Sequence, residues 1–335
     1  MPAHVSILPS GHDFSIDGPD SILEGALHAG VPLNYGCSGG NCGLCKARLV
    51  SGQVRKTRHH DYVLTEAEKS QGYVLMCSNA AVTDVEIEAD VAGGVHDIPL
   101  QQIAARVKSI TALNPDMALL HLQTPRTNRL RFLAGQSVML RLGGAVSGVL
   151  PIASCPCDDR NLLFHVPRRP GNVFLDHLFS RLASNDIVDI EGPQGEFILH
   201  EKSSRPLCFI AFDTGFAPVK SLIEHALSLD TSEAIFFYWI GSDERSIYLP
   251  NIGRAWADAL DNFHYTELAA GYDLASLTEK SGEMLKTMLQ GIAEGCHEIR
   301  NGDIYIAGQE QAVRAAAQFF VGMGVSNVRV FATGW

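Results

Sequence analysis

The chain has 335 residues and a formal net charge of −11, from 26 Lys and Arg against 37 Asp and Glu. The length predicts about two or three domains, and the acidic balance argues against nucleic acid as a partner. No apolar run approaches the roughly 18 residues of a membrane span, and the N-terminus lacks the features of a signal peptide, so we expect a cytoplasmic protein with reduced thiols.

The first 90 or so residues predict a small mixed unit of strands and helices. Ser21 and Glu24 have the spacing of a capping box at the start of an amphipathic helix, which Gly30 ends. Thr65 and Glu68 repeat the capping pattern for a second, shorter helix. The predicted strands are a hairpin over 4–16, a short strand over 46–50 and an alternating strand over 84–89.

Between the first helix and the 46–50 strand lies YGCSGGNCGLCKAR, with Cys37, Cys42 and Cys45 in the spacing C-x4-C-x2-C. Cys77 follows in a distant segment, and together the four have the plant-type ligand pattern of a [2Fe–2S] cluster. A tight loop must supply three thiolates and wrap an anionic core with inward N–H groups, which its glycines permit. A zinc site would favour paired C-x2-C knuckles, and a disulfide framework would suit a short secreted chain.

Four further cysteines lie outside this set. They are Cys155, Cys157, Cys208 and Cys296, of which Cys208 falls in an apolar strand and is expected in the core. Cys155 and Cys157 form a C-x-C, but no third or fourth ligand stands nearby in the sequence, so a second metal site is disfavoured.

After a Gly-rich linker at 91–94, the chain predicts two different architectures in turn. Short alternating strands over 103–124, broken at Asn114-Pro115-Asp116, and over 137–142 predict a small antiparallel barrel that runs to about Phe197. From Pro206 onward strands and helices alternate, which predicts a doubly wound parallel sheet with a nucleotide at the C-terminal ends of its strands. The elements expected there are strands over 206–212, 234–240, 303–307 and 327–331 and helices from about 218 and over 311–320.

This order of units resembles the single-chain NADH-dependent reductases that carry FAD and [2Fe–2S] and feed electrons to oxygenases. The segments EGPQGEF and TGFAPVKSLIEHAL look like CDP-6-deoxy-3,4-glucoseen reductases, and YWIGSDERSIYLP looks like reductases of aromatic-ring dioxygenases. The resemblance implies a multidomain α+β and α/β protein: a β-grasp ferredoxin domain at 1–92, an antiparallel FAD-type barrel at 100–200 and a doubly wound NAD-type domain at 205–335.

The resemblance also places candidate cofactor residues. For FAD they are Pro151, Ile152, Ala153, Ser154, Arg168, Asn172 and Phe331, where Phe331 would cover the flavin with Trp335 following at the terminus. For NADH they are Thr214, Gly215, Asp243 and Gly308. Asp243 and Glu244 would disfavour the 2′-phosphate of NADPH. No residue is assigned a catalytic role.

The cofactor motifs depart from the family pattern. In the family's Arg-x-Tyr-Ser motif the Arg binds FAD phosphate, the Tyr stacks on the flavin and the Ser hydrogen-bonds its ring; here the motif is replaced by Gly148-Val149-Leu150-Pro151. The family's His-Val-Arg becomes His165-Val166-Pro167, although Arg168 and Arg169 follow directly and could substitute. The Gly-Gly-Thr-Gly turn of the nicotinamide half becomes Phe212-Asp213-Thr214-Gly215, which puts a carboxylate where pyrophosphate would approach. Unscreened like charges ~4 Å apart cost about 4 kcal/mol at an effective dielectric near 20.

Three hypotheses follow. In the first, the protein is an enzyme that passes electrons from NADH through FAD and the cluster to a partner protein such as an oxygenase component. In the second, it is a non-enzymatic [2Fe–2S] electron carrier whose reductase module has lost flavin or nicotinamide binding. In the third, it is a CDP-6-deoxy-3,4-glucoseen reductase.

Overall fold

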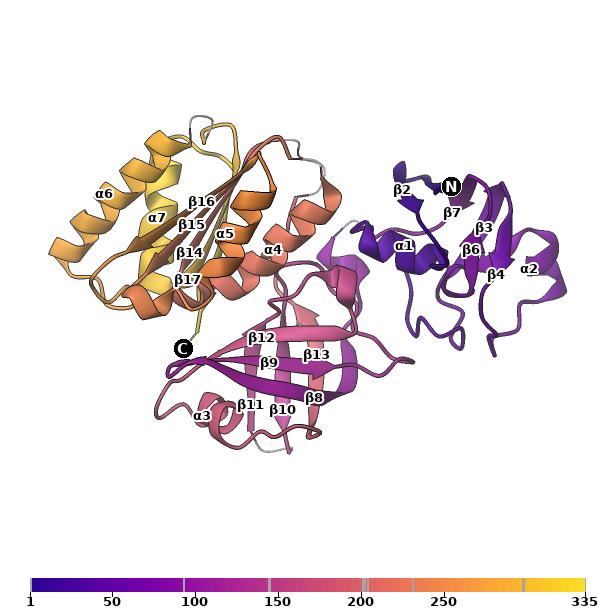
Figure 1. Ribbon diagram of the computed structural model, residues 1–335, viewed down its shortest axis with the longest axis horizontal. Helices are drawn as coiled ribbons and strands as arrows, with labels where there is room; N and C mark the ends of the chain where they lie inside the picture. The colour runs from indigo at the N-terminus through magenta and orange to yellow at the C-terminus, as the bar shows by residue number, and fades with distance from the viewer. Residues whose placement is uncertain are drawn as a thin grey trace.

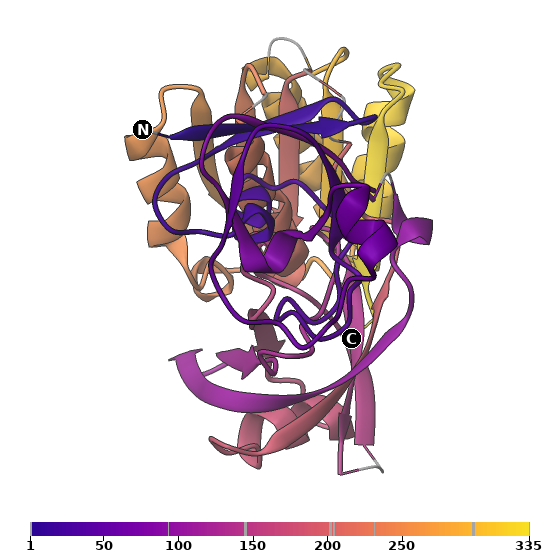
Figure 2. The same ribbon diagram turned by 90° about the vertical axis from the view of Figure 1, so that its right-hand side faces the viewer.

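The computed structural model describes residues 2–92, 94–143, 146–200, 203, 205–230, 232–296 and 299–334. It forms three units along the chain, each around its own sheet (Figure 1). The N-terminal unit lies to one side of the other two, and Figure 2 looks at the molecule with this unit facing the viewer. The predicted linker at 91–94 includes Gly93, which lies outside the described residues, as does Trp335.

The N-terminal unit is a five-stranded sheet in the order β2-β1-β7-β3-β5, with α1 packed on it. The predicted hairpin is confirmed, with β1 antiparallel to β2. Both predicted capping boxes are confirmed: the Ser21 hydroxyl accepts from the Glu24 N–H at 3.2 Å, and Thr65 does the same for Glu68. The elements are β1 (Ala3–Leu8), β2 (His12–Ile16), α1 (Ile22–His28), β3 (Lys46–Ser51), β4 (Val54–Lys56), α2 (Glu66–Ser70), β5 (Tyr73–Leu75), η1 (Met76–Ser78), β6 (Asn79–Ala81) and β7 (Val85–Glu88).

The middle unit is the predicted antiparallel structure, a six-stranded sheet in the order β11-β10-β13-β8-β9-β12. Its strands alternate buried and exposed side chains, so one face encloses an aliphatic core to which α3 adds Phe174, Leu175 and Leu178. The elements are η2 (Val95–Asp97), β8 (Gln101–Asn114), β9 (Met117–Gln123), β10 (Ser137–Leu142), β11 (Val146–Pro151), η3 (Pro156–Asp158), β12 (Asn161–Pro167), α3 (Val173–Ser180) and β13 (Ile187–Gln194).

The C-terminal unit is the predicted parallel sheet, in the order β16-β15-β14-β17-β18, with helices on both faces (Figure 1). The central strand β14 is buried at all six positions, as its continuous apolar run requires. Helices α4 and α5 pack on one face, and α6 and α7 on the other. The elements are β14 (Leu207–Phe212), η4 (Asp213–Gly215), α4 (Phe216–Leu229), β15 (Ile235–Gly241), η5 (Glu244–Ser246), α5 (Pro250–Ala259), β16 (Phe263–Ala269), α6 (Glu279–Gly295), β17 (Asp303–Gln309), α7 (Glu310–Gly322) and β18 (Val328–Thr333).

Two features of this unit differ from or extend the sequence-based expectation. Helix α4 begins at Phe216 rather than at about Pro218, because a proline is tolerated in the first turn, where its missing N–H has no intrahelical acceptor. The stretch between β15 and β17 adds α5, β16 and α6. Among the described residues, no helix is both long and apolar enough to cross a membrane.

Candidate cluster and cofactor sites

The cluster loop lies between α1 and β3, and its backbone is folded around the thiol groups. The N–H groups of Asn41 and Cys42 point at Sγ of Cys37, at 3.2 and 3.3 Å. The N–H groups of Cys37 and Leu44 point at Sγ of Cys42, at 3.4 and 3.5 Å. Such N–H donors stabilise negative charge on sulfur, which a thiolate-bound cluster requires.

The four predicted ligands lie as two pairs in neighbouring positions. Cys37 and Cys42 share the N–H groups of the loop, and Sγ of Cys45 lies 3.2 Å from Sγ of Cys77, which η1 carries. Hydrogen bonding from Cys45 lowers the pKa of the Cys77 thiol to about 6, with smaller contributions from Ser78 and the positive charge of Arg58. Two thiol pairs suit the two irons of a [2Fe–2S] cluster, since each iron takes two protein thiolates.

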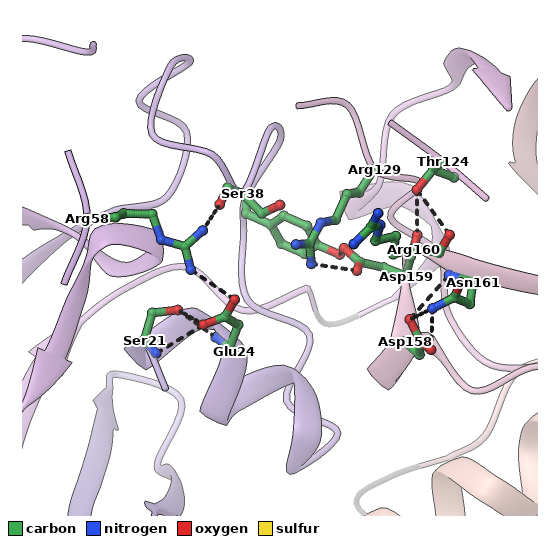
Figure 3. Close-up of polar contacts among 11 residues, drawn as sticks. Ser21, Glu24, Ser38, Arg58, Thr124, Arg129, Asp158, Asp159, Arg160 and Asn161 are labelled. Atoms are coloured by element: carbon green, nitrogen blue, oxygen red, sulfur yellow. Dashed lines mark hydrogen bonds and ion pairs between the residues drawn. The ribbon is translucent and has the colours of Figure 1, made fainter. Parts of the chain in front are cut away.

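A buried polar contact joins the cluster loop to the barrel. Tyr35, two residues before Cys37, donates its hydroxyl to the Asp159 carboxylate at 2.6 Å, across a separation of 124 residues. Arg129 forms an ion pair with the same carboxylate at 3.0 Å (Figure 3). Arg131 lies over the Tyr35 ring and donates to the Asn34 side chain at 2.6 Å. Because Tyr35, Asp159 and Arg131 are almost entirely buried, the contact holds the loop in one position against the barrel.

We expect Tyr35→Phe to weaken this docking. The buried Asp159 carboxylate would lose a donor, at a cost of about 1–3 kcal/mol. The loss should appear as a lower midpoint for thermal bleaching of the cluster's visible absorption. Tyr73→Phe is the matched control, since the Tyr73 hydroxyl makes no hydrogen bond within the described residues. An unchanged midpoint in Tyr35→Phe would contradict a role of this hydrogen bond in docking.

The segment 151–154, predicted to contact FAD, is packed against the C-terminal unit. Lys220 and Ser221 of α4 donate to the carbonyls of Ala153 and Ser154, at 3.1 and 2.7 Å. The N–H groups of Ile152 and Ala153 donate to other barrel carbonyls, and Pro151 has no N–H. These backbone groups already have protein partners, so a flavin would have to share the carbonyls with those donors or displace the partners of the N–H groups.

The positions that replace the Arg-x-Tyr-Ser motif are also filled. Leu150 is 0% exposed and belongs to the barrel core. A Cβ added to Gly148 would lie 2.2 Å from a ring carbon of Phe174, the second residue of α3. The donors and the stacking ring of the family motif are therefore absent, and a phenylalanine occupies the space that the arginine would cross.

The remaining FAD candidates do not gather around one opening. Arg168 lies over the Phe179 ring, and the Asn172 side chain accepts from the Leu175 N–H as the N-cap of α3. Phe331 stacks at a tilt on Phe197, with ring centroids 5.7 Å apart. The cavity that Phe331 lines is otherwise formed by Gly135, by residues 195–197 and by its own neighbours in β18, and its lining does not include the 151–154 segment.

A cavity of about 480 Å³ lies between the barrel and the C-terminal edge of the parallel sheet. Thr214 and Asp243, two of the four NADH candidates, line it, and the buried Thr214 hydroxyl has no partner among the described residues. Arg169, which the sequence offered with Arg168 as a substitute for the lost FAD-binding arginine, lines this cavity from the barrel side. The location agrees with the rule that parallel sheets bind ligands beyond their strand ends.

Asp213 places a carboxylate at the cavity where the family has glycine. Its carboxylate is 7% exposed and accepts from both the N–H and the hydroxyl of Ser242, at 2.6 and 2.7 Å, and from the Gln309 amide. Burial raises the pKa of this carboxyl, against the opposing effect of those donors. These bonds link the ends of β14, β15 and β17 and hold the carboxylate in place. Because the Ser242 and Gln309 donors offset its negative charge, the carboxylate should repel a phosphate less than expected from the sequence.

The two glycine candidates have a structural role at the same edge. A Cβ on Gly215 would lie 2.0 Å from the Ala307 carbonyl oxygen, and one on Gly308 would lie 2.5 Å from the Phe212 carbonyl oxygen. Gly308 also has a positive φ of 143°. They allow the turn before α4 to approach β17 closely, which shapes the floor of the cavity without contributing side chains.

The cysteines that were set aside at the sequence level lie at a junction. Cys155 and Cys157 form a disulfide in η3, and the Cys155 N–H donates to Glu224 of α4 at 3.2 Å. The expectation that all thiols are reduced therefore does not hold for this pair. Cys208 is buried in β14, as expected.

Three family descriptions match successive parts of this chain: a 2Fe-2S iron-sulfur cluster binding domain at residues 5–82, an oxidoreductase FAD-binding domain at 104–198 and an oxidoreductase NAD-binding domain at 209–318. The chain is 30% identical over 331 residues to the CDP-6-deoxy-L-threo-D-glycero-4-hexulose-3-dehydrase reductase of Yersinia pestis, covering 99% of this chain and 98% of that protein. It is 30% identical over 270 residues to terephthalate 1,2-dioxygenase reductase component 1 of Comamonas sp, covering 79% of each chain. A cytochrome P450 reductase from Amycolatopsis has the same fold, with a TM-score of 0.60, 24% identity and 98% of each chain covered.

Proposed function

The chain belongs to the single-chain ferredoxin-type reductases with [2Fe–2S], FAD-binding and NAD-binding domains, and we propose that it delivers electrons from NADH to a partner protein through its cluster. The observation that carries the proposal is the complete set of cluster thiols, surrounded by N–H donors, in a loop docked on the barrel. Flavin, when bound, connects a two-electron hydride donor to a one-electron cluster. The protein's own contribution is to position the loop and to leave Cys42 exposed as a point of electron exit.

We propose an oxygenase component as the electron acceptor, since the relatives include reductase components of oxygenases. A second candidate acceptor is a sugar-nucleotide dehydrase, as in the glucoseen branch. It is favoured by the match to the Yersinia reductase over almost the whole of both chains. Mixing the purified protein with each class of acceptor and NADH, and following acceptor reduction, distinguishes the two.

A non-enzymatic carrier remains a second candidate function. It is favoured by the occupied 151–154 segment and by Phe174 in the space beside Gly148. A visible spectrum of the purified protein followed by anaerobic addition of NADH decides between the functions. Flavin bands together with bleaching of the cluster support the reductase. Cluster bands without flavin, unaffected by NADH even after FAD is added, would overturn it in favour of the carrier.

We expect NADH to be preferred over NADPH by about tenfold in steady-state ferricyanide reduction. A 2′-phosphate near the Asp243 and Glu244 carboxylates would meet like charge, against which Arg245, 3.5 Å from Asp243, offers a single cation, and about 1.4 kcal/mol of net repulsion gives one decade. Asp243→Asn should narrow the preference, since asparagine can still accept from the Ser246 N–H, which now donates at 2.9 Å. Asp273→Asn is the matched control, since Asp273 lines the same cavity and makes no salt bridge within the described residues. Equal or faster rates with NADPH would contradict the assignment.

A further inference from the structure

Two basic segments stand out in a chain whose net charge is −11. The first, 53–60, contains three Lys and Arg and two His but no Asp or Glu, and the second, 124–131, contains three Arg and again no acid. They belong to different domains, the first to the ferredoxin unit and the second to the loop after β9 in the barrel. Solubility alone does not explain why positive charge should gather in two short segments of an acidic protein, so these segments call for another explanation.

Both segments border the cluster loop. Strand β4 pairs with β6, which places Lys56 opposite Asn79, two residues after Cys77. Arg58 then donates to the Ser38 carbonyl at 3.4 Å. From the barrel side, a Cβ on Gly39 would lie 3.9 Å from both the Arg126 carbonyl oxygen and the Thr127 methyl group. The fold therefore brings the two basic segments to opposite sides of one loop.

Some of these cations are used inside the protein. Arg58 pairs with Glu24 at 2.9 Å and Arg129 with the buried Asp159 at 3.0 Å (Figure 3). Arg131 is itself buried. Of the nearby carboxylates, Glu66 pairs with Lys69 and Glu68 with Lys46, whereas the exposed Asp61 has a histidine, His59, as its neighbour at 3.7 Å and keeps one acidic group beside the first segment.

Three cations are left without a counter-ion. Arg55, Lys56 and Arg126 are exposed and make no salt bridge within the described residues. The cluster ligand Cys42 is also exposed, and Leu44 beside it is 56% exposed, so the cluster loop has an open side. An exposed redox centre flanked by unpaired charge is suited to electrostatic guidance of a partner.

We propose that Arg55, Lys56 and Arg126 form a basic rim around the cluster, onto which an electron-acceptor protein docks through an acidic face. The proposal rests on the proposed delivery of electrons to a partner protein and adds the chemistry of the docking face. The overall charge of −11 repels an acidic protein from most of the surface. Within roughly 8–10 Å of the rim, about one Debye length at moderate salt, the positive charge dominates and selects one orientation.

The test uses two forms of one probe, native cytochrome c, which is basic, and succinylated cytochrome c, which is acidic. The cluster is reduced anaerobically with dithionite, excess reductant is removed, and oxidation of the cluster is followed after rapid mixing. The reduced cluster gives one electron to the ferric haem, which becomes ferrous, and no bond or proton is exchanged. We expect the acidic form to react about tenfold faster at low ionic strength and the difference to vanish at high salt.

The charge-reversal variant Arg55→Glu/Lys56→Glu/Arg126→Glu should reverse the order of the two probes. The control Lys280→Glu/Lys286→Glu/Arg314→Glu makes the same change of charge at exposed positions on α6 and α7, at the far end of the molecule (Figure 1), and should keep the wild-type order. If the triple rim variant loses its cluster absorption, Arg126→Glu alone is expected to reduce the preference.

Faster reaction of the native, basic form with the unmodified protein would overturn the proposal, since net charge alone predicts that order. Equal responses of the rim and control variants would also overturn it. NADH and flavin take no part in the measurement, so failure of the proposed reductase function leaves this test unaffected. Conversely, the protein could be reduced by NADH and still show no preference for the acidic cytochrome c, which would overturn the basic rim alone.

Discussion

Cys42→Ser and Cys77→Ser are each expected to lose most of the bound iron, and with it all electron transfer to a protein acceptor. Each variant removes one thiolate from one of the two pairs that the fold brings together. A hydroxyl is a poor substitute, because soft thiolate ligands select iron–sulfur clusters. Iron and sulfide content per chain, together with the visible spectrum, measure the loss. The intact protein should have a potential of roughly −400 mV, as in plant-type ferredoxins.

Cys208→Ser is the matched control for these variants. Cys208 is buried in β14 of a different domain, so its replacement should affect stability without affecting iron content. Full retention of iron in both Cys42→Ser and Cys77→Ser would show that the cluster, if present, has other ligands. Equal loss of iron in all three variants would indicate that unfolding rather than ligand removal is being measured.

The second large effect concerns flavin affinity. The barrel lacks the phosphate-binding arginine, at a cost of about 1.5–3 kcal/mol, and the stacking tyrosine, at a cost of about 0.5–1.5 kcal/mol. If the two costs add, FAD should bind about 30- to 2,000-fold more weakly than to a chain with the intact motif. We therefore expect the protein to be purified with substoichiometric flavin, and occupancy to rise when FAD is added. Titration of FAD followed by flavin fluorescence measures the affinity.

Restoring the motif requires three changes rather than two. Arginine at position 148 would collide with Phe174, as the 2.2 Å distance from an added Cβ indicates, so Gly148→Arg and Leu150→Tyr need Phe174→Ala beside them. The triple variant should tighten FAD binding by about tenfold or more. Phe174→Ala alone opens the same space without adding contacts and is the control, with circular dichroism to confirm folding. Stoichiometric FAD that survives dialysis in the unmodified protein would contradict the expected weakness.

The cluster loop and the helix caps were predictable because their interactions are local. Three of the four cluster cysteines lie within nine residues, and each capping box spans four, so spacing along the chain already constrains geometry. The central strand β14 was predictable from its unbroken apolar run. Strand β16 was not proposed, because FHYTELA mixes polar and apolar residues and is only half-buried at the sheet edge.

Which groups fill the predicted FAD and NADH sites depends on contacts between residues far apart in the sequence, and no local sequence pattern predicts such contacts. Lys220 reaches the Ala153 carbonyl across 67 residues, and Gln309 reaches Asp213 across 96. Sequence comparison could show that family residues were missing, but the groups that replace them come from elements packed together only in the folded chain. Phe174 closes the space beside Gly148 because α3 packs against β11.

The ligands of the cluster could be predicted from the sequence, but the contacts that surround the cluster loop could not. Spacing and residue type identify the thiols, since a thiolate set for two irons has few alternatives. The hydrogen bond from Tyr35 to Asp159, and the approach of Arg126 to a loop in another domain, require the barrel and the ferredoxin unit to be docked. Contacts between residues so far apart follow from the packing of whole domains, which the linear order of side chains does not specify.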